Sequence, residues 1–206
     1  MMPLDPFYPV VDSAAWIAGL LPAGIKLVQL RIKDASAPDL RDEVRRARDL
    51  CRAAGARLVL NDHWRLAIDE GIDFIHLGQE DLDGADVPAL RRAGIAVGVS
   101  THTHDELDRA LSVNPAYVAL GPIFPTRLKA MPWVPQGIDR IATWRRVIGD
   151  LPLVAIGGIT VERAGACLQA GATSVAVVTD IVTSPDPATR CQDWISRTRP
   201  AGISRR

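Results

Sequence analysis

Residues 57–77 read RLVLNDHWRLAIDEGIDFIHL, and this stretch contains the repeating unit on which the fold depends. An apolar run over Arg57–Leu60 is followed by an amphipathic helical pattern over His63–Glu70 and by a second apolar run over Phe74–Leu77. Runs that are apolar at nearly every position are typical of strands buried on both faces of a parallel sheet. The stretch therefore predicts a strand–helix–strand unit with parallel strands and a right-handed crossover.

The same alternation extends along the rest of the chain. The other predicted strands are Tyr8–Val11, Leu27–Arg31, Ala96–Ser100, Tyr117–Leu120, Leu153–Ile156 and Ser174–Val178. The other predicted helices are Ser13–Leu21, Pro38–Ala54, Pro88–Ala93, His104–Ser112, Ile138–Ile148, Val161–Ala170 and Pro187–Thr198. Eight such units predict an α/β fold with a single compact (β/α)8 TIM barrel over residues 1–206, shorter than the roughly 250 residues typical of such barrels. The alternative, a doubly wound open sheet that binds a dinucleotide, has no Gly-x-Gly-x-x-Gly motif after the first strand to support it.

Composition limits the classes of partner. Lys plus Arg and Asp plus Glu both total 24, so no global charge favours nucleic acid or an anionic membrane. Cys51, Cys167 and Cys191 are widely spaced, which favours reduced thiols in packed helices over disulfides or a structural zinc. We expect a cytoplasmic protein, because the start of the chain has no basic leader and no apolar run approaches a membrane span. The segment from about 199 to 206 is expected to form a disordered tail.

Polar side chains alternate with apolar ones around the second predicted strand. Gln29, Arg31 and Lys33 interleave with Val28, Leu30 and Ile32. Alternate side chains of a strand share one face, so the two cations and the amide should point the same way. Two like charges on a buried face are costly without a partner, and a multiply charged anion would supply one.

Carboxylates follow the next two strands. In a (β/α)8 barrel the chemistry lies at the carboxyl ends of the strands, which is where Asn61, Asp62 and Asp81 fall. Asp62 and Asp81 close neighbouring strands, and Mg²⁺ commonly takes one or two protein carboxylates together with substrate phosphate oxygens. The alternative is that Asp62 caps a helix and Asp81 caps a turn. We expect a Mg²⁺ site and a diphosphate site here, because the cations lie one strand away.

A second anion site is predicted after the last two strands. Gly157 and Gly158 allow close approach of the backbone to a phosphate, and Val178 and Thr179 would present amides from the neighbouring strand. The proline-rich loop over residues 121–137 is long enough to be functional. Its Arg127 and Lys129 would close over the anions and exclude water.

No convincing nucleophile–base pair is present. Ser100 and His102 share one side of an extended segment, but no acid is evident to orient the histidine. His102 and His104 lack a third zinc ligand, and His76 is interpreted as a buried histidine with satisfied hydrogen bonds.

These motifs together resemble the thiamine phosphate synthase (thiamine phosphate pyrophosphorylase) family, from Tyr8 to Ile181. The motifs that carry the resemblance are Gln29-Leu30-Arg31-Ile32-Lys33-Asp34, Leu60-Asn61-Asp62, His76-Leu77-Gly78-Gln79-Glu80-Asp81-Leu82, Gly98-Val99-Ser100-Thr101-His102, Gly121-Pro122-Ile123-Phe124-Pro125-Thr126 and Ala155-Ile156-Gly157-Gly158-Ile159. The resemblance implies a Mg²⁺-dependent transferase of thiamine biosynthesis. It would join a hydroxymethylpyrimidine diphosphate to a thiazole phosphate through a dissociative carbocation route, giving thiamine monophosphate and pyrophosphate.

The resemblance also implies a role for each matching residue. The segment Gln29, Leu30, Arg31, Ile32 and Lys33 would hold the pyrimidine diphosphate together with Asn61, Ser100 and Lys129, while Asp62 and Asp81 would hold Mg²⁺. Among these, Arg31, Lys33, Ser100 and Lys129 would assist catalysis. The thiazole phosphate would be bound by Thr126, Arg127, Leu128, Gly158, Val178 and Thr179.

The chain departs from the family pattern at one of these positions. Leu128 stands where the family usually carries a hydroxyl residue, so one phosphate donor is missing. Two alternatives follow: a thiazole tautomerase-like isomerase, which has no need of the metal carboxylates or the diphosphate cations, and a noncatalytic protein that binds thiamine precursors. The partners are phosphorylated small molecules in each case, and a homo-oligomer is compatible with the sequence.

Overall fold

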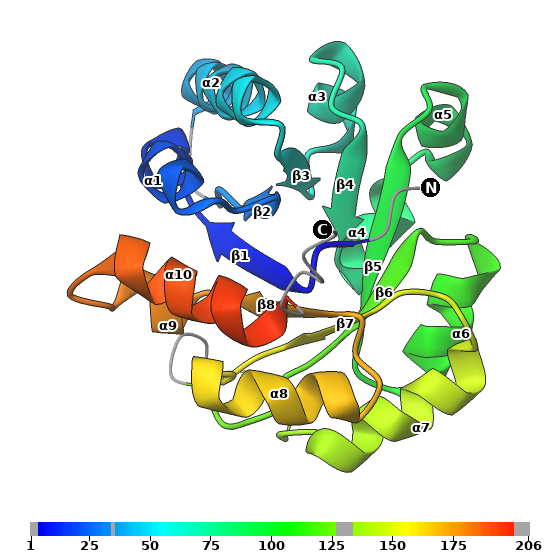
Figure 1. The fold of residues 1–206 in the computed structure, drawn as a ribbon. Coiled ribbons are helices and arrows are strands. Elements are labelled where there is room, and N and C mark those ends of the chain that lie inside the picture. Colours follow the sequence, from blue (N-terminus) through cyan, green and yellow to red (C-terminus); the bar gives the residue numbers. More distant parts are fainter. Residues whose placement is uncertain (1–3, 34–35, 127–133, 200–206) are drawn as a thin grey trace, which may run out of the picture.

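Eight parallel strands form a closed barrel, in which each strand pairs with the next along the chain and β8 pairs with β1 (Figure 1). This computed structural model describes residues 4–33, 36–126 and 134–199. The strands are β1 Phe7–Val11, β2 Leu27–Leu30, β3 Arg57–Asn61, β4 Phe74–Leu77, β5 Ala96–Thr101, β6 Tyr117–Leu120, β7 Leu153–Ile156 and β8 Ser174–Val177. The predicted (β/α)8 barrel is confirmed.

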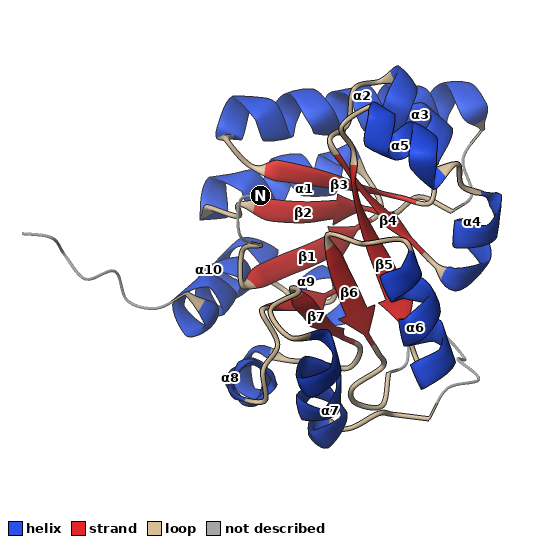
Figure 2. Ribbon diagram, turned by 90° about the vertical axis from the view of Figure 1, so that its right-hand side faces the viewer, coloured by secondary structure: helices blue, strands red, loops and turns tan. Residues whose placement is uncertain are grey.

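Helices surround the strands on the outside of the barrel (Figure 2). They are α1 Ala14–Leu20, the 3-10 turn η1 Leu21–Ala23, α2 Ala37–Ala54, α3 Trp64–Asp69, α4 Gln79–Gly84, α5 Val87–Arg92, α6 His104–Ser112, α7 Ile138–Ile148, α8 Val161–Gln169, α9 Thr179–Val182 and α10 Pro187–Thr198. The sequence analysis missed α4 and α9. Both follow directly after the carboxyl end of a strand. α4 (QEDLDG) has a single apolar side chain and α9 spans four residues, so neither shows an apolar helical period.

Polar side chains determine where several helices begin. The side chains of Ser13, Asp86, Thr103 and Asp186 each accept a hydrogen bond from a backbone amide three residues ahead, at the starts of α1, α5, α6 and α10. Such caps satisfy amides that have no partner inside the helix. These residues therefore end the preceding connections at fixed positions around the barrel.

Two apolar layers hold the structure together. The barrel interior is filled by side chains from every strand, and its largest rings are Tyr8, Phe74 and Tyr117. The second layer lies between the strands and the helices, where Val28 and Leu30 of β2 are fully buried. The predicted alternation holds over Val28, Gln29 and Leu30, because Gln29 belongs to the opposite, inward face, where it contacts Tyr8.

The strand β2 is shorter than predicted. It ends at Leu30, and Arg31 still donates its backbone amide to Val11 O at 2.8 Å. Ile32 packs against the outer apolar layer, and Lys33 lies exposed in the loop that follows. The two cations therefore sit beyond the strand, at the carboxyl end of the barrel.

The ends of the described chain are close to each other. Arg199 forms an ion pair with Asp5 at 3.0 Å and donates to Gly24 O, which fixes the first residue of the expected tail; residues 200–206 lie outside the described part. The three cysteines are buried in α2, α8 and α10. Across the described ranges, no helix combines the length and apolar character that a membrane crossing requires.

Candidate active site

The pair formed by Asp62 and Asp81 is the most unusual feature of the carboxyl rim. Asp62 follows β3 in a left-handed backbone conformation (φ 65°), and its amide donates to His76 O at 2.9 Å. Asp81 lies in the first turn of α4, where its carboxylate approaches the bare Gly78. A Cβ on Gly78 would come within 2.9 Å of Asp81 Oδ2, so the glycine gives this carboxylate its place.

The two carboxylates share a hydrogen bond, and their charges oppose each other. Burial, followed by repulsion from Asp81, raises the pKa of Asp62 to about 6, while Arg31 and His63 act in the opposite direction. A carboxylate pair of this kind is costly when both members are ionised and gains strongly from a cation placed between them.

These residues fit a magnesium ion. Among the residues that the structure describes, no group of three or more His, Cys, Asp or Glu side chains forms a metal cage. Mg²⁺ does not need one, because it typically takes one or two protein carboxylates and fills its remaining positions with water and substrate phosphate. Asp62 and Asp81 supply that minimal oxygen set.

The residues predicted around β2 and β3 for the diphosphate lie in four different environments. Arg31 is partly buried and close enough to Asp62 and His76 to lower the pKa of both. Gln29 and Asn61 are buried on the inward face of the barrel, while Lys33 is exposed. Leu30 and Ile32 face the helices, so only their backbone groups could reach a ligand at the rim.

Ser100 ends a chain of hydrogen bonds that crosses the barrel interior. Gln29 Nε2 donates to the Tyr8 hydroxyl at 2.9 Å, which lies 3.1 Å from the Tyr117 hydroxyl. Tyr117 is bonded to His76 Nδ1 at 2.7 Å, and His76 Nε2 to Ser100 Oγ at 2.8 Å. The interpretation of His76 as a satisfied buried histidine is confirmed. Tyr8 and Tyr117 were missed, although their inward strand positions were available as a signal.

His102 has the acid that the sequence analysis did not find. Its Nδ1 lies 2.8 Å from Glu106 Oε2, one turn into α6. The expectation that no acid orients this histidine was therefore wrong. Ser100 nevertheless bonds to His76 rather than to His102, so these residues do not form a Ser-His-Glu triad.

The glycine pair after β7 is packed under the loop that follows β6. Both glycines are left-handed, with φ 99° at Gly157 and 64° at Gly158. A Cβ on Gly158 would lie 2.4 Å from Pro125 O, and one on Gly157 would lie 2.6 Å from Pro122 Cα. Only glycine fits at either position, and within the described ranges the Gly158 amide has no backbone acceptor.

Neighbouring elements hold this turn and the start of α9 in place. Arg163 donates to Gly158 O at 2.8 Å and lies over the Phe124 ring. In α9, Asp180 accepts from Arg190 and from Trp194 Nε1 of α10. Ile156 pairs with Ala176, so the Gly157–Gly158 turn and the Val178–Thr179 segment leave the ends of two paired strands.

The long loop is described only at its two ends. Thr126 is partly buried at the first end, and Gln136 and Gly137 donate to Pro122 O and Ile123 O at the second. Arg127, Leu128 and Lys129 lie outside the described residues.

Comparisons with known proteins agree with this arrangement. A family model described as thiamine monophosphate synthase matches residues 7–181. A thiamine-phosphate synthase from Rhizobium etli is 60% identical over 97% of this chain and 98% of its own length, and one from Cronobacter sakazakii is 50% identical over 87% and 85%. A thiamine phosphate pyrophosphorylase from Pyrococcus furiosus shares the fold, with a TM-score of 0.83 at 22% identity over 93% of this chain and 94% of that one.

Proposed function

The chain belongs to the thiamine monophosphate synthase family, and from this premise we propose that it is a Mg²⁺-dependent thiamine phosphate synthase. It transfers the hydroxymethylpyrimidine group from its diphosphate to a thiazole phosphate. The products are thiamine monophosphate and pyrophosphate.

One observation carries the assignment: Asp62, Asp81 and Arg31 converge at one rim of the barrel. Arg31 is near enough to lower the pKa of Asp62. Burial and the charge of Asp81 outweigh this effect and raise that pKa to about 6. A cation between the carboxylates would offset their repulsion, and an anion beside Arg31 would balance the charge of its guanidinium. A magnesium diphosphate supplies that pair of charges in one ligand.

The chemistry requires charge stabilisation rather than a protein nucleophile. The bond between the pyrimidine methylene and the diphosphate oxygen breaks, and the electron pair leaves with the diphosphate. The thiazole nitrogen then attacks the resulting carbocation and forms the new C–N bond. Arg31, Lys33 and the Ser100 hydroxyl bind the oxygens on which negative charge develops, and the barrel rim orients the two substrates.

Asp62 and Asp81 would hold the metal. When bound, Mg²⁺ would neutralise charge on the diphosphate oxygens. A cation held by both carboxylates would offset their mutual repulsion, which adds to burial in raising the pKa of Asp62.

The thiazole phosphate is assigned to the opposite side of the rim. Gly158, Val178 and Thr179 would offer backbone amides just beyond the ends of the paired strands β7 and β8. Thr126 adds a hydroxyl, and Leu128 contributes none. Backbone amides and Arg127 therefore carry more of the binding here than in relatives with a second hydroxyl.

A pyrophosphate-release assay with both precursors tests the proposal. Release should require the pyrimidine diphosphate, the thiazole phosphate and Mg²⁺ together. Calorimetry with each precursor should show binding of both. Binding without release would favour a noncatalytic precursor-binding protein, and isomerisation of a thiazole phosphate alone would favour a tautomerase.

A further inference from the structure

The buried hydrogen-bond chain from Gln29 to Ser100 has one direction that satisfies all of its protons. Gln29 Nε2 can only donate, so the Tyr8 oxygen receives that hydrogen bond. The Tyr8 proton then needs an acceptor, and in the described part of the molecule the only hydrogen-bond partner besides Gln29 is Tyr117 O, 3.1 Å away. The opposite polarity would leave the Tyr8 proton buried without an acceptor, which is costly.

This direction determines the state of His76. Once Tyr117 accepts from Tyr8, its own proton goes to His76 Nδ1 at 2.7 Å. A ring nitrogen that accepts a hydrogen bond carries no proton of its own, so the imidazole is neutral. Its single proton therefore lies on Nε2, which donates to Ser100 Oγ at 2.8 Å.

We propose that Tyr117 and His76 are positioning residues that fix the Nε2–H tautomer of His76 and so make the Ser100 hydroxyl a dedicated donor to the diphosphate. With its oxygen occupied by His76, Ser100 has its proton free for an acceptor at the rim. Among described residues no other acceptor for that proton is found. The inference rests on the proposed function, which places the diphosphate beside Ser100.

The packing around Tyr117 supports its role in orienting His76. The Tyr117 and His76 rings stack nearly parallel, with centroids 5.6 Å apart at 14°. Tyr117 crosses the space that a side chain on Gly98 would occupy, since a Cβ there would lie 2.1 Å from the Tyr117 ring. The bare position on β5 is therefore what lets the ring reach His76.

The first test is the tautomer itself, read by ¹⁵N NMR on the full chain without substrates. The protein has four histidines, and the signal of His76 can be assigned by its loss in His76→Asn. Wild type should show His76 protonated at Nε2. An Nδ1–H signal would overturn the proposal, because the chain would then run from Ser100 toward Gln29.

Two phenylalanine variants distinguish the direction of the hydrogen-bond chain from the general effect of removing a buried hydroxyl. Tyr117→Phe removes the donor to Nδ1, so the Nε2–H tautomer should lose its dominance. Tyr8→Phe removes an equally buried hydroxyl but leaves the Tyr117 proton with His76 as acceptor, and the tautomer should persist. Equal behaviour of the two variants would contradict the assigned direction.

Turnover gives the third readout, measured as pyrophosphate release with Mg²⁺ and both substrates. Tyr117→Phe should lower kcat roughly 10- to 100-fold, the range typical of groups that orient another ligand, with a smaller change in KM. In a Ser100→Ala background it should cause no further loss. Thr101→Val is the matched control, because it deletes a fully buried hydroxyl on the opposite face of β5 and should reduce stability while keeping kcat.

The outcomes distinguish failure of the positioning role from failure of the proposed function. An unchanged kcat in Tyr117→Phe, or an equal loss in the Ser100→Ala background, would refute the positioning role in an enzyme that still releases pyrophosphate. A wild-type protein that releases none would refute the proposed function. The tautomer measurement decides the polarity of the chain in either case, including if Tyr117→Phe fails to fold.

Discussion

Asp62 has a left-handed backbone conformation, and its carboxylate interacts with that of Asp81. Both features limit which residues can replace it. Asn tolerates φ near 65° almost as well as Asp, so Asp62→Asn keeps the backbone and removes the charge. We expect kcat/KM to fall on the order of 10²–10³, the usual cost of losing one preorganised electrostatic group. Steady-state kinetics over a Mg²⁺ series measures the loss.

The control for Asp62→Asn is Asp73→Asn. Asp73 is exposed just before β4, at the amino end of the barrel, so the same chemical change there should leave kcat/KM close to wild type. Matching losses in the two variants would mean that the effect does not arise at the carboxyl rim.

Two lysines bracket β2 and test which end of the barrel handles the diphosphate. Lys26 precedes the strand and Lys33 follows it, and both are exposed. Lys33→Ala should lower kcat/KM on the order of 10²-fold, because it removes a cation from the leaving diphosphate. Lys26→Ala should have little effect, and a wild-type rate in Lys33→Ala would remove this residue from the diphosphate site.

The β7–α8 turn depends on the absence of a side chain at Gly158. Gly158→Ala adds a methyl group 2.4 Å from Pro125 O, so the turn must move, and the amide would lose the position from which we propose that it binds the thiazole phosphate. The KM for the thiazole phosphate should rise about 10-fold or more, with a smaller effect on the KM for the pyrimidine diphosphate.

Gly55, at the end of α2, provides a control with a left-handed backbone and no clash. Its φ is 62° and its ψ is 33°, and no atom lies within 4 Å of a Cβ built there. Gly55→Ala should cost about 1 kcal/mol of stability and leave both KM values unchanged. An equal rise in KM from both glycine variants would argue against a specific phosphate turn.

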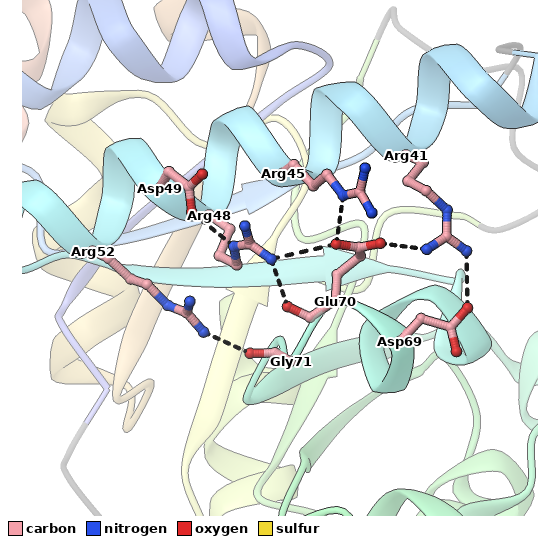
Figure 3. Close-up of polar contacts among 8 residues, drawn as sticks. All are labelled: Arg41, Arg45, Arg48, Asp49, Arg52, Asp69, Glu70 and Gly71. Carbon is pink, nitrogen blue, oxygen red and sulfur yellow. Dashed lines mark hydrogen bonds and ion pairs between the residues drawn. The ribbon is translucent and has the colours of Figure 1, made fainter.

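A row of arginines joins α2 to the end of α3 (Figure 3). Glu70, whose side chain is only 4% exposed, accepts from Arg41, Arg45 and Arg48. Glu70→Gln should destabilise the protein by about 1–2 kcal/mol. This is less than for a fully buried pair, because the arginine side chains are 21–49% exposed and can turn toward water.

The pH dependence of this contact follows from the direction in which the pKa of Glu70 is shifted. The hydrogen bond from Arg45, with help from Arg41, lowers the pKa of Glu70 below its ordinary value. The contribution of ionised Glu70 to the free energy of unfolding is therefore complete above the pKa of about 4.3 that it has in the unfolded chain. This contribution is lost as pH falls through the pKa of the folded state. Urea unfolding should separate wild type from Glu70→Gln at pH 7 and bring them together near pH 3; a constant difference would contradict this.

The closed barrel protects all three thiols at once. Cys51, Cys167 and Cys191 lie under helices that pack on the strands, and burial raises their pKa values to about 12, 11 and 12. A disulfide reagent at pH 8 should label none of them quickly in the native protein and all of them in denaturant. Fast labelling of one native thiol would show that its helix opens locally rather than with the whole barrel.

The sequence alone determined the barrel and predicted which polar residues lie at its carboxyl rim. Strand and helix periods are local properties, and eight apolar runs separated by amphipathic segments leave few other topologies. Because parallel strands end together, the positions of Asp62, Asp81 and Gly158 in the chain already predicted a common edge. The helices α4 and α9 were missed because α4 carries one apolar side chain and α9 is a single turn, so neither has a measurable apolar period.

Only the tertiary structure decided which polar groups meet inside the barrel. Tyr8 lies 109 residues from Tyr117, Tyr117 lies 41 from His76, and His76 lies 24 from Ser100, so no local pattern connects them. Closure of the sheet brings these side chains together, and the low-dielectric interior then requires each proton to find an acceptor. That requirement, rather than any motif, gives Ser100 its direction.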